Sequence, residues 1–79
     1  MERKLTNIEP RDAAKALRFL GFTKAGSKGD HHVYTNGGRK AEIPQRKGRS
    51  LSENSVLLIL RRGGLTRDQF LAAIDGKTA

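Results

Sequence analysis

Two adjacent histidines, His31 and His32, are the side chains in this chain best suited to chemistry. Free imidazole has a reference pKa of about 6.5, so a histidine side chain can exchange a proton near neutral pH without a metal. The pair lies in a run of β-type residues between Gly29 and Gly37. On spacing alone, the commonest role of a histidine in a strand is structural, so a catalytic role has to be argued from its surroundings.

The residue pattern does not support most other chemistries. Neighbouring strand residues point to opposite faces, so His31 and His32 are poorly placed to ligate one metal ion. The chain has no cysteine, and therefore neither a disulfide nor a thiolate metal site. No serine is singled out as a nucleophile beside a base, and Gly26-x-x-Gly29 is not followed by a helix, as a dinucleotide loop would be. We expect no metal and no cofactor.

A single histidine acting on RNA remains the best match, because RNA supplies its own nucleophile, the 2′-hydroxyl group. A positioned base contributes roughly 10²–10⁴-fold to the rate of such a reaction. Cations beside it would stabilise the negative charge that develops on the phosphate. The formal net charge of +8 favours a polyanion or an acidic protein as partner. A non-catalytic RNA-binding module and a protein that binds only an acidic partner stay open as alternatives.

Basic residues flank the histidines on both sides in sequence. Residues 39–49 carry five basic residues and one acidic residue, which favours a phosphate-binding surface over a merely solvated one. Aromatic residues are too few for recognition of single strands by stacking. The residues expected to contact RNA are Lys24, Lys28, Gly29, Arg39, Lys40, Arg46 and Lys47.

The segment before the histidines predicts one helix. We expect residues 1–9 to be flexible and residues 10–76 to form a single domain. Pro10 suits the first position of a helix, and Gly21 suits its end. An apolar stripe at helical spacing is expected to face the core and consists of Ala13, Ala14, Leu17 and Leu20.

Three strands are expected next. Residues 22–24 predict a short strand, residues 25–29 a flexible turn, residues 30–35 a second strand and residues 39–43 a third that Pro44 ends. A two-residue turn at Asn36-Gly37 is favoured, and any even loop places His32 on the core face with Ile43. His31 then lies on the opposite face, whereas an odd loop would place His31 on the core face instead.

The last third of the chain predicts two helices. Ser52 is a good N-cap for the first, whose apolar face is expected to consist of Val56, Leu57, Ile59 and Leu60. Thr66 and Gln69 match a capping box for the second, which Gly76 ends. The expected fold is therefore α+β, in the order α-β-β-β-α with a three-stranded antiparallel sheet and a short extra C-terminal helix.

From about residue 10 to residue 70, the chain resembles the HicA-type toxins. The first helix ends in Gly21-Phe22, and a basic strand leads to Gly29-Asp30-His31-His32-x-Tyr34. A glycine turn and a basic strand ending in Ile43-Pro44 follow. The segment from Ser55 to Thr66 is similar to the family's closing helix and its Gly-Leu-Thr end.

This resemblance implies a double-stranded-RNA-binding-domain-like fold and a metal-independent, ribosome-independent mRNA endonuclease. Such a toxin belongs to a type II toxin–antitoxin system, with a HicB-type antitoxin as its partner. The family's catalytic histidine carries over to His31. Asp30 stands where the family usually has serine, and Asn54-Ser55 where it has Gly-Thr; Asp30 could orient the imidazole by a hydrogen bond.

No apolar run approaches the roughly 20 residues that span a bilayer. The N-terminal residues also lack the apolar region of a signal peptide. We expect a cytoplasmic protein with no membrane partner.

Overall fold

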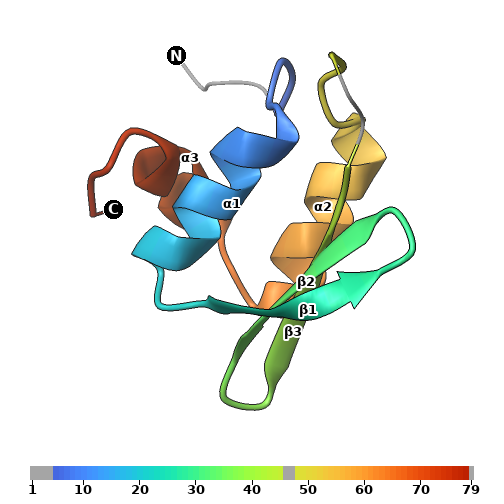
Figure 1. The fold of residues 1–79 in the computed structure, drawn as a ribbon. Helices are drawn as coiled ribbons and strands as arrows, with labels where there is room; N and C mark the ends of the chain where they lie inside the picture. Colours follow the sequence, from blue (N-terminus) through green and yellow to red (C-terminus); the bar gives the residue numbers. More distant parts are fainter. Residues whose placement is uncertain (1–4, 46–47, 79) are drawn as a thin grey trace.

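The computed structural model describes residues 5–45 and 48–78, which form three helices and three strands (Figure 1). The strands build one antiparallel sheet in the order β1-β2-β3. This arrangement confirms the expected α+β fold, of the double-stranded-RNA-binding-domain type with an added C-terminal helix. In chain order the elements are α1 Pro10–Phe19, β1 Thr23–Lys28, β2 His31–Asn36, β3 Arg39–Pro44, α2 Glu53–Gly63 and α3 Arg67–Ile74.

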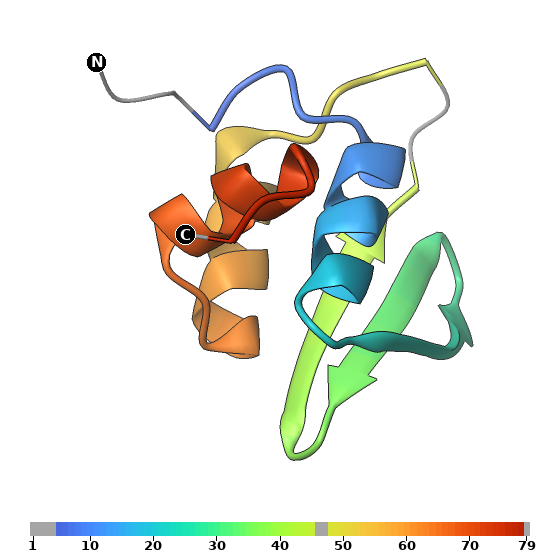
Figure 2. The same cartoon turned by 90° about the vertical axis from the view of Figure 1, so that its left-hand side faces the viewer.

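The first helix begins at Pro10, as predicted, and its N-terminus is closed by a capping box between Glu9 and Asp12. Its buried face differs slightly from the expected stripe. Ala13, Ala16 and Leu17 are fully buried, whereas Ala14 and Leu20 are only half-buried. The face is rotated because α1 packs against both α3 and β3, side by side with α3 in Figure 2.

Core contacts start before this helix. Leu5 and Ile8 are 1% and 2% exposed, and both belong to the same cluster as the helix residues. The backbone N–H of Leu51 donates to the carbonyl of Ile8 at 2.7 Å, which ties the segment before α1 to the segment before α2.

The prediction of a flexible turn at residues 25–29 is wrong for residues 25–28, which belong to β1. β1 continues through Lys28, and its pairing with β2 is interrupted only by an irregularity between Lys24 and Gly26. A bulge of this kind absorbs one extra residue without ending the strand, and glycine is tolerated there. The connection to β2 is therefore a two-residue turn, Gly29-Asp30, since Lys28 pairs directly with His31.

The predicted side for each histidine is confirmed. His32 pairs with Ile43 across β2 and β3, on the face that carries the core, and His31 pairs with Pro44 on the other face. The loop has two residues, but they are Gly37-Gly38 rather than Asn36-Gly37. Gly37 alone of the two has a positive φ, +62°, which is the position that type II′ turns reserve for glycine. Sliding a two-residue loop by one position leaves the sides unchanged.

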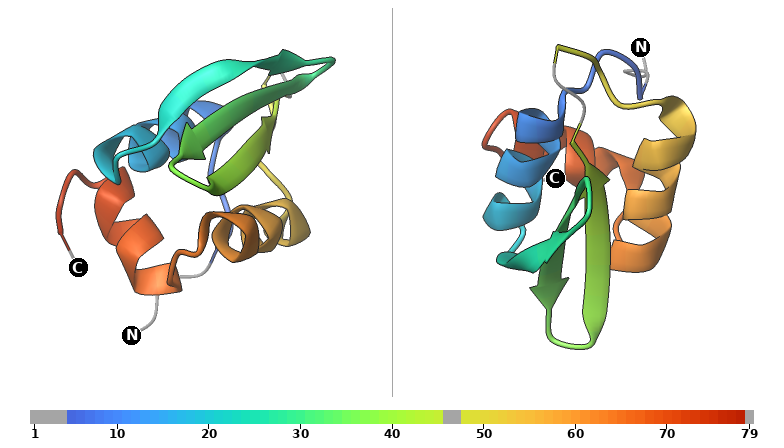
Figure 3. Two further views of the ribbon diagram at one scale, coloured as in Figure 1. Left: turned by 90° about the horizontal axis from the view of Figure 1, so that it is seen from below. Right: turned by 45° about the vertical axis from the view of Figure 1, so that its right-hand side comes forward.

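The two C-terminal helices have the predicted caps. The Ser52 hydroxyl accepts from the N–H of Ser55, and Thr66 and Gln69 form both bonds of a capping box. α2 lies along β3, so that β3 runs between α1 and α2 (Figure 3). One assignment was wrong: Leu57 is 46% exposed instead of facing the core. Leu58 beside it is 47% exposed.

Candidate functional site

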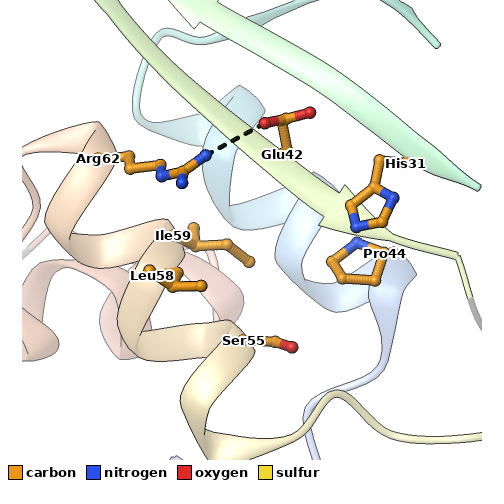
Figure 4. Close-up of a pocket in the computed structure, with 7 residues that line it drawn as sticks. All are labelled: His31, Glu42, Pro44, Ser55, Leu58, Ile59 and Arg62. Carbon is orange, nitrogen blue, oxygen red and sulfur yellow. Dashed lines mark hydrogen bonds and ion pairs between the residues drawn. The ribbon is translucent and has the colours of Figure 1, made fainter. Parts of the chain in front are cut away.

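His31 is exposed at the start of β2 and lines a groove between the end of the β2–β3 pair and α2 (Figure 4). Strand alternation directs its side chain away from the face that carries Tyr34 and Ile43. The groove has a volume of about 220 Å³. Its lining comes from β2, β3 and α2 and consists of His31, Glu42, Pro44, Ser55, Leu58, Ile59 and Arg62.

An ion pair spans this groove from α2 to β3. Arg62 Nη1 donates to Glu42 Oε2 at 3.2 Å, and the two side chains are 57% and 22% exposed. Figure 4 shows this pair at one end of the groove and the His31 ring beside Pro44 at the other. The bond uses one of the five N–H donors of the guanidinium group, so Arg62 retains donors for a second anion. The groove thus holds an imidazole, a hydroxyl and a cation.

His32 lies on the other side of the sheet. It is half-buried and lines a second groove, of about 380 Å³, between the end of the sheet and α1. The other residues of this lining are Pro10, Arg11, Ala14, Lys15, Arg18 and Gln45. The two adjacent histidines therefore face separate grooves.

Only some of the expected RNA-binding residues gather at His31. Lys28 is its direct cross-strand partner, a relation that places Cβ atoms about 5 Å apart. Gly29 lies in the adjoining turn with φ +58°. Lys40 pairs with Thr35 on the same face as His31, four residues further along and so about 13 Å away.

The remaining candidates are elsewhere. Lys24 pairs with Tyr34 and Arg39 pairs with Asn36, which places both on the face opposite to His31. The Arg39 guanidinium lies against Gly64, at the end of α2. Arg46 and Lys47 lie outside the described residues.

Arg62 and Ser55 were not predicted as site residues. Both come from α2, more than twenty residues after His31, and no local pattern marks a side chain that reaches a groove through tertiary packing. Arg62 is visible in the sequence only as a basic residue of a last helical turn. Glu42 is the acidic residue within the basic segment 39–49, and in the structure it forms the ion pair with Arg62.

Asp30 contributes its backbone, since its carbonyl accepts from the N–H of Gln45 at 2.7 Å. Both Asp30 and His31 are described, and no hydrogen bond joins the carboxylate of one to the ring of the other. The orienting role expected of Asp30 is therefore not seen.

Within residues 5–45 and 48–78, no three His, Cys, Asp or Glu side chains cluster as metal ligands would. In that same part of the chain, no helix combines the length and apolarity needed to cross a membrane. Neither a scan against models of protein families nor a search of curated proteins finds a match.

Proposed function

We propose that the protein is an endoribonuclease, an mRNA interferase of the HicA type, that acts on mRNA in the cytoplasm and uses His31 as its general base and acid. One observation carries the proposal: the strand register leaves His31 exposed, beside Lys28 and in one groove with Arg62. Attack by a 2′-hydroxyl on the adjacent phosphate is accelerated by a base that takes the hydroxyl proton and by cations that stabilise the charge developing on the phosphate.

In the proposed reaction, the neutral His31 imidazole takes the proton of the 2′-hydroxyl, and the 2′-oxygen forms a bond to phosphorus. The bond from phosphorus to the 5′-oxygen breaks, and this oxygen takes the proton from the His31 imidazolium, which returns to the neutral form. The products are a 2′,3′-cyclic phosphate and a free 5′-hydroxyl. Lys28 and Arg62 stabilise the charge on the non-bridging oxygens, and no step uses a metal ion.

The test is cleavage of a defined RNA in EDTA by the parent protein and two histidine variants. We expect the parent to yield 2′,3′-cyclic phosphate ends and His31→Ala to lose at least about 100-fold in rate. His32→Ala is the comparison variant, because it removes the same side chain from the other face, and at saturating RNA it should keep the kcat of the parent. Intact RNA with the parent, or full activity in His31→Ala, would sink the catalytic assignment.

One observation favours a second candidate, a non-catalytic RNA-binding module. No described residue makes a hydrogen bond that fixes the orientation of the His31 ring. In the same assay this module would bind RNA, leave it intact and be indifferent to His31→Ala.

We also propose an acidic HicB-type antitoxin as the protein partner. Its support is the exposed pair Leu57 and Leu58, an apolar surface on α2 beside Arg61. Apolar anchors flanked by charge are typical of protein interfaces. Leu58 also lines the His31 groove, so a partner seated on these leucines would cover the proposed catalytic histidine.

A further inference from the structure

The groove that contains His32 carries more unbalanced charge than the groove that contains His31. Arg11, Lys15 and Arg18 line it, and its lining includes no carboxylate. In the His31 groove the one lining cation, Arg62, is already paired with Glu42. An anion is therefore attracted more strongly to the lining of this groove than to the lining of the His31 groove.

The three cations form a row along α1. Their spacing of four and then three residues places them on one helical face, with rises of about 6 Å and about 4.5 Å between successive Cα atoms. The Arg18 guanidinium carbon lies 6.0 Å from the centre of the Tyr34 ring, which anchors that side chain over the sheet. Lys15 has no ion pair with any described residue.

Arg11 has one competing contact. Its Nε donates to Glu9 at 2.9 Å, with the two side chains 85% and 46% exposed. Exposed pairs of this kind are worth little, so a phosphate can replace the carboxylate at small cost. Lys15 and Arg18 make no ion pair with a described residue, so they are better candidates than Arg11 for phosphate contacts.

The two grooves lie on opposite faces at the same end of the sheet. His31 and Pro44 line one, while the residues that directly follow them, His32 and Gln45, line the other. A strand of RNA would have to pass around this end of β2 and β3 to occupy both grooves.

We infer that the groove lined by Arg11, Lys15, Arg18 and His32 is a binding site for the phosphates of the RNA strand that His31 acts on. This inference rests on the proposed function. A nucleotide chain presents one charge per residue at regular intervals, which suits a row of cations. An acidic protein is less suited, because the exposed large apolar side chains Phe19, Leu57 and Leu58 lie outside this groove.

The inference can be tested by binding of a fluorescein-labelled single-stranded RNA to non-cleaving His31→Ala protein, followed by anisotropy over a range of salt concentrations. The double variant Lys15→Gln/Arg18→Gln should bind at least about tenfold more weakly. Its salt slope should fall by about 1.4, since each lost phosphate contact removes about 0.7 for single strands. The matched control Arg61→Gln/Lys77→Gln loses the same charge elsewhere and should retain most of the affinity and the slope.

The charge-preserving variant Lys15→Arg/Arg18→Lys should bind as the parent does, and thermal unfolding verifies that each variant is folded. Equal losses in the groove variant and in the control would overturn the inference, because net charge alone would then explain binding. Loss of binding to an acidic partner protein with RNA binding intact would overturn it as well.

Cleavage kinetics separate this inference from the proposed function. With His31 present, the groove variant should raise KM and leave kcat unchanged. Cleavage that depends on His31 but shows an unchanged KM in the groove variant would reject the phosphate site alone. A parent protein that never cleaves RNA, yet binds it through Lys15 and Arg18, would reject the catalytic assignment alone.

Discussion

Arg62 donates a hydrogen bond to Glu42 at 3.2 Å across 20 residues of sequence, and this pair offsets the charge of the cation that lines the proposed catalytic groove. The pair also joins α2 to β3, the two elements that form the groove walls. A substrate phosphate at His31 would share the guanidinium group with Glu42, whose carboxylate offsets part of its charge. The following variants test this relationship and others in the structure.

Removal of the Glu42 charge should improve RNA binding. In Glu42→Gln the guanidinium of Arg62 is free for phosphate, and we expect affinity to rise by roughly threefold, or about 0.7 kcal/mol. The pair is partly exposed, so the free energy of unfolding should change by less than about 1 kcal/mol. Glu53→Gln, which makes the same charge change at the start of α2, is the control. The same gain in both variants, measured by anisotropy, would contradict a specific role for Glu42.

Leu57→Ser should disrupt partner binding without affecting the fold. Leu57 is 46% exposed, so its replacement should change the free energy of unfolding by less than about 0.5 kcal/mol. Calorimetric titration with the proposed acidic HicB-type antitoxin should show binding at least about tenfold weaker, a loss of about 1.4 kcal/mol. Thr78→Ala, at an exposed position outside α2, should bind normally. Unchanged binding by Leu57→Ser would place the interface elsewhere.

Phe70 should be the most sensitive single core position of α3. Its side chain is 0% exposed, and truncation of a buried phenylalanine to alanine costs about 3–5 kcal/mol. In a domain of this size such a loss leaves much of the protein unfolded. Phe70→Leu keeps most of the volume and should cost far less. Urea unfolding measures both, and a cost below about 1 kcal/mol for Phe70→Ala would show that the core is loosely packed there.

Gly64 and Gly76 allow a matched comparison of two glycines with left-handed backbone at helix ends, with φ of +65° and +72°. Alanine at either position should cost about 1–2 kcal/mol of unfolding free energy, because a Cβ atom is disfavoured in this conformation. At Gly64 the new methyl group also displaces the Arg39 guanidinium, whereas Gly76 has open space around it. We therefore expect the larger loss at Gly64. Introducing Arg39→Ala into both variants should remove the difference, and a persistent difference would assign it to the backbone alone.

Features that depend on neighbouring residues could be predicted from the sequence. The caps at Ser52 and Thr66 and the glycine ends of the helices are local hydrogen-bond and steric effects, and the structure has them as expected. The face of the sheet on which each histidine lies could also be predicted, because strand alternation makes it depend only on whether the hairpin loop has an even or odd number of residues.

Features that depend on packing could not be predicted. Residues 25–28 have turn-like composition, yet pairing with β2 holds them in a strand through a bulge. Leu57 fits the helical stripe of α2, but α2 packs on β3 through a narrower face. The candidate site combines both kinds of feature. His31 and Lys28 are brought together by the register of one hairpin, whereas Arg62 reaches the groove through the tertiary packing of α2.

The bulge in β1 has a consequence for how the protein behaves at high concentration. β1 is an outer strand of the sheet, and all six of its residues are exposed, so its unpaired backbone edge could recruit the same strand from another molecule. The irregularity at Gly26 and the charges of Lys24 and Lys28 are the devices that discourage such self-association. Lys28 would then have two roles. It lies beside the proposed catalytic histidine, and its charge limits association between molecules at high concentration.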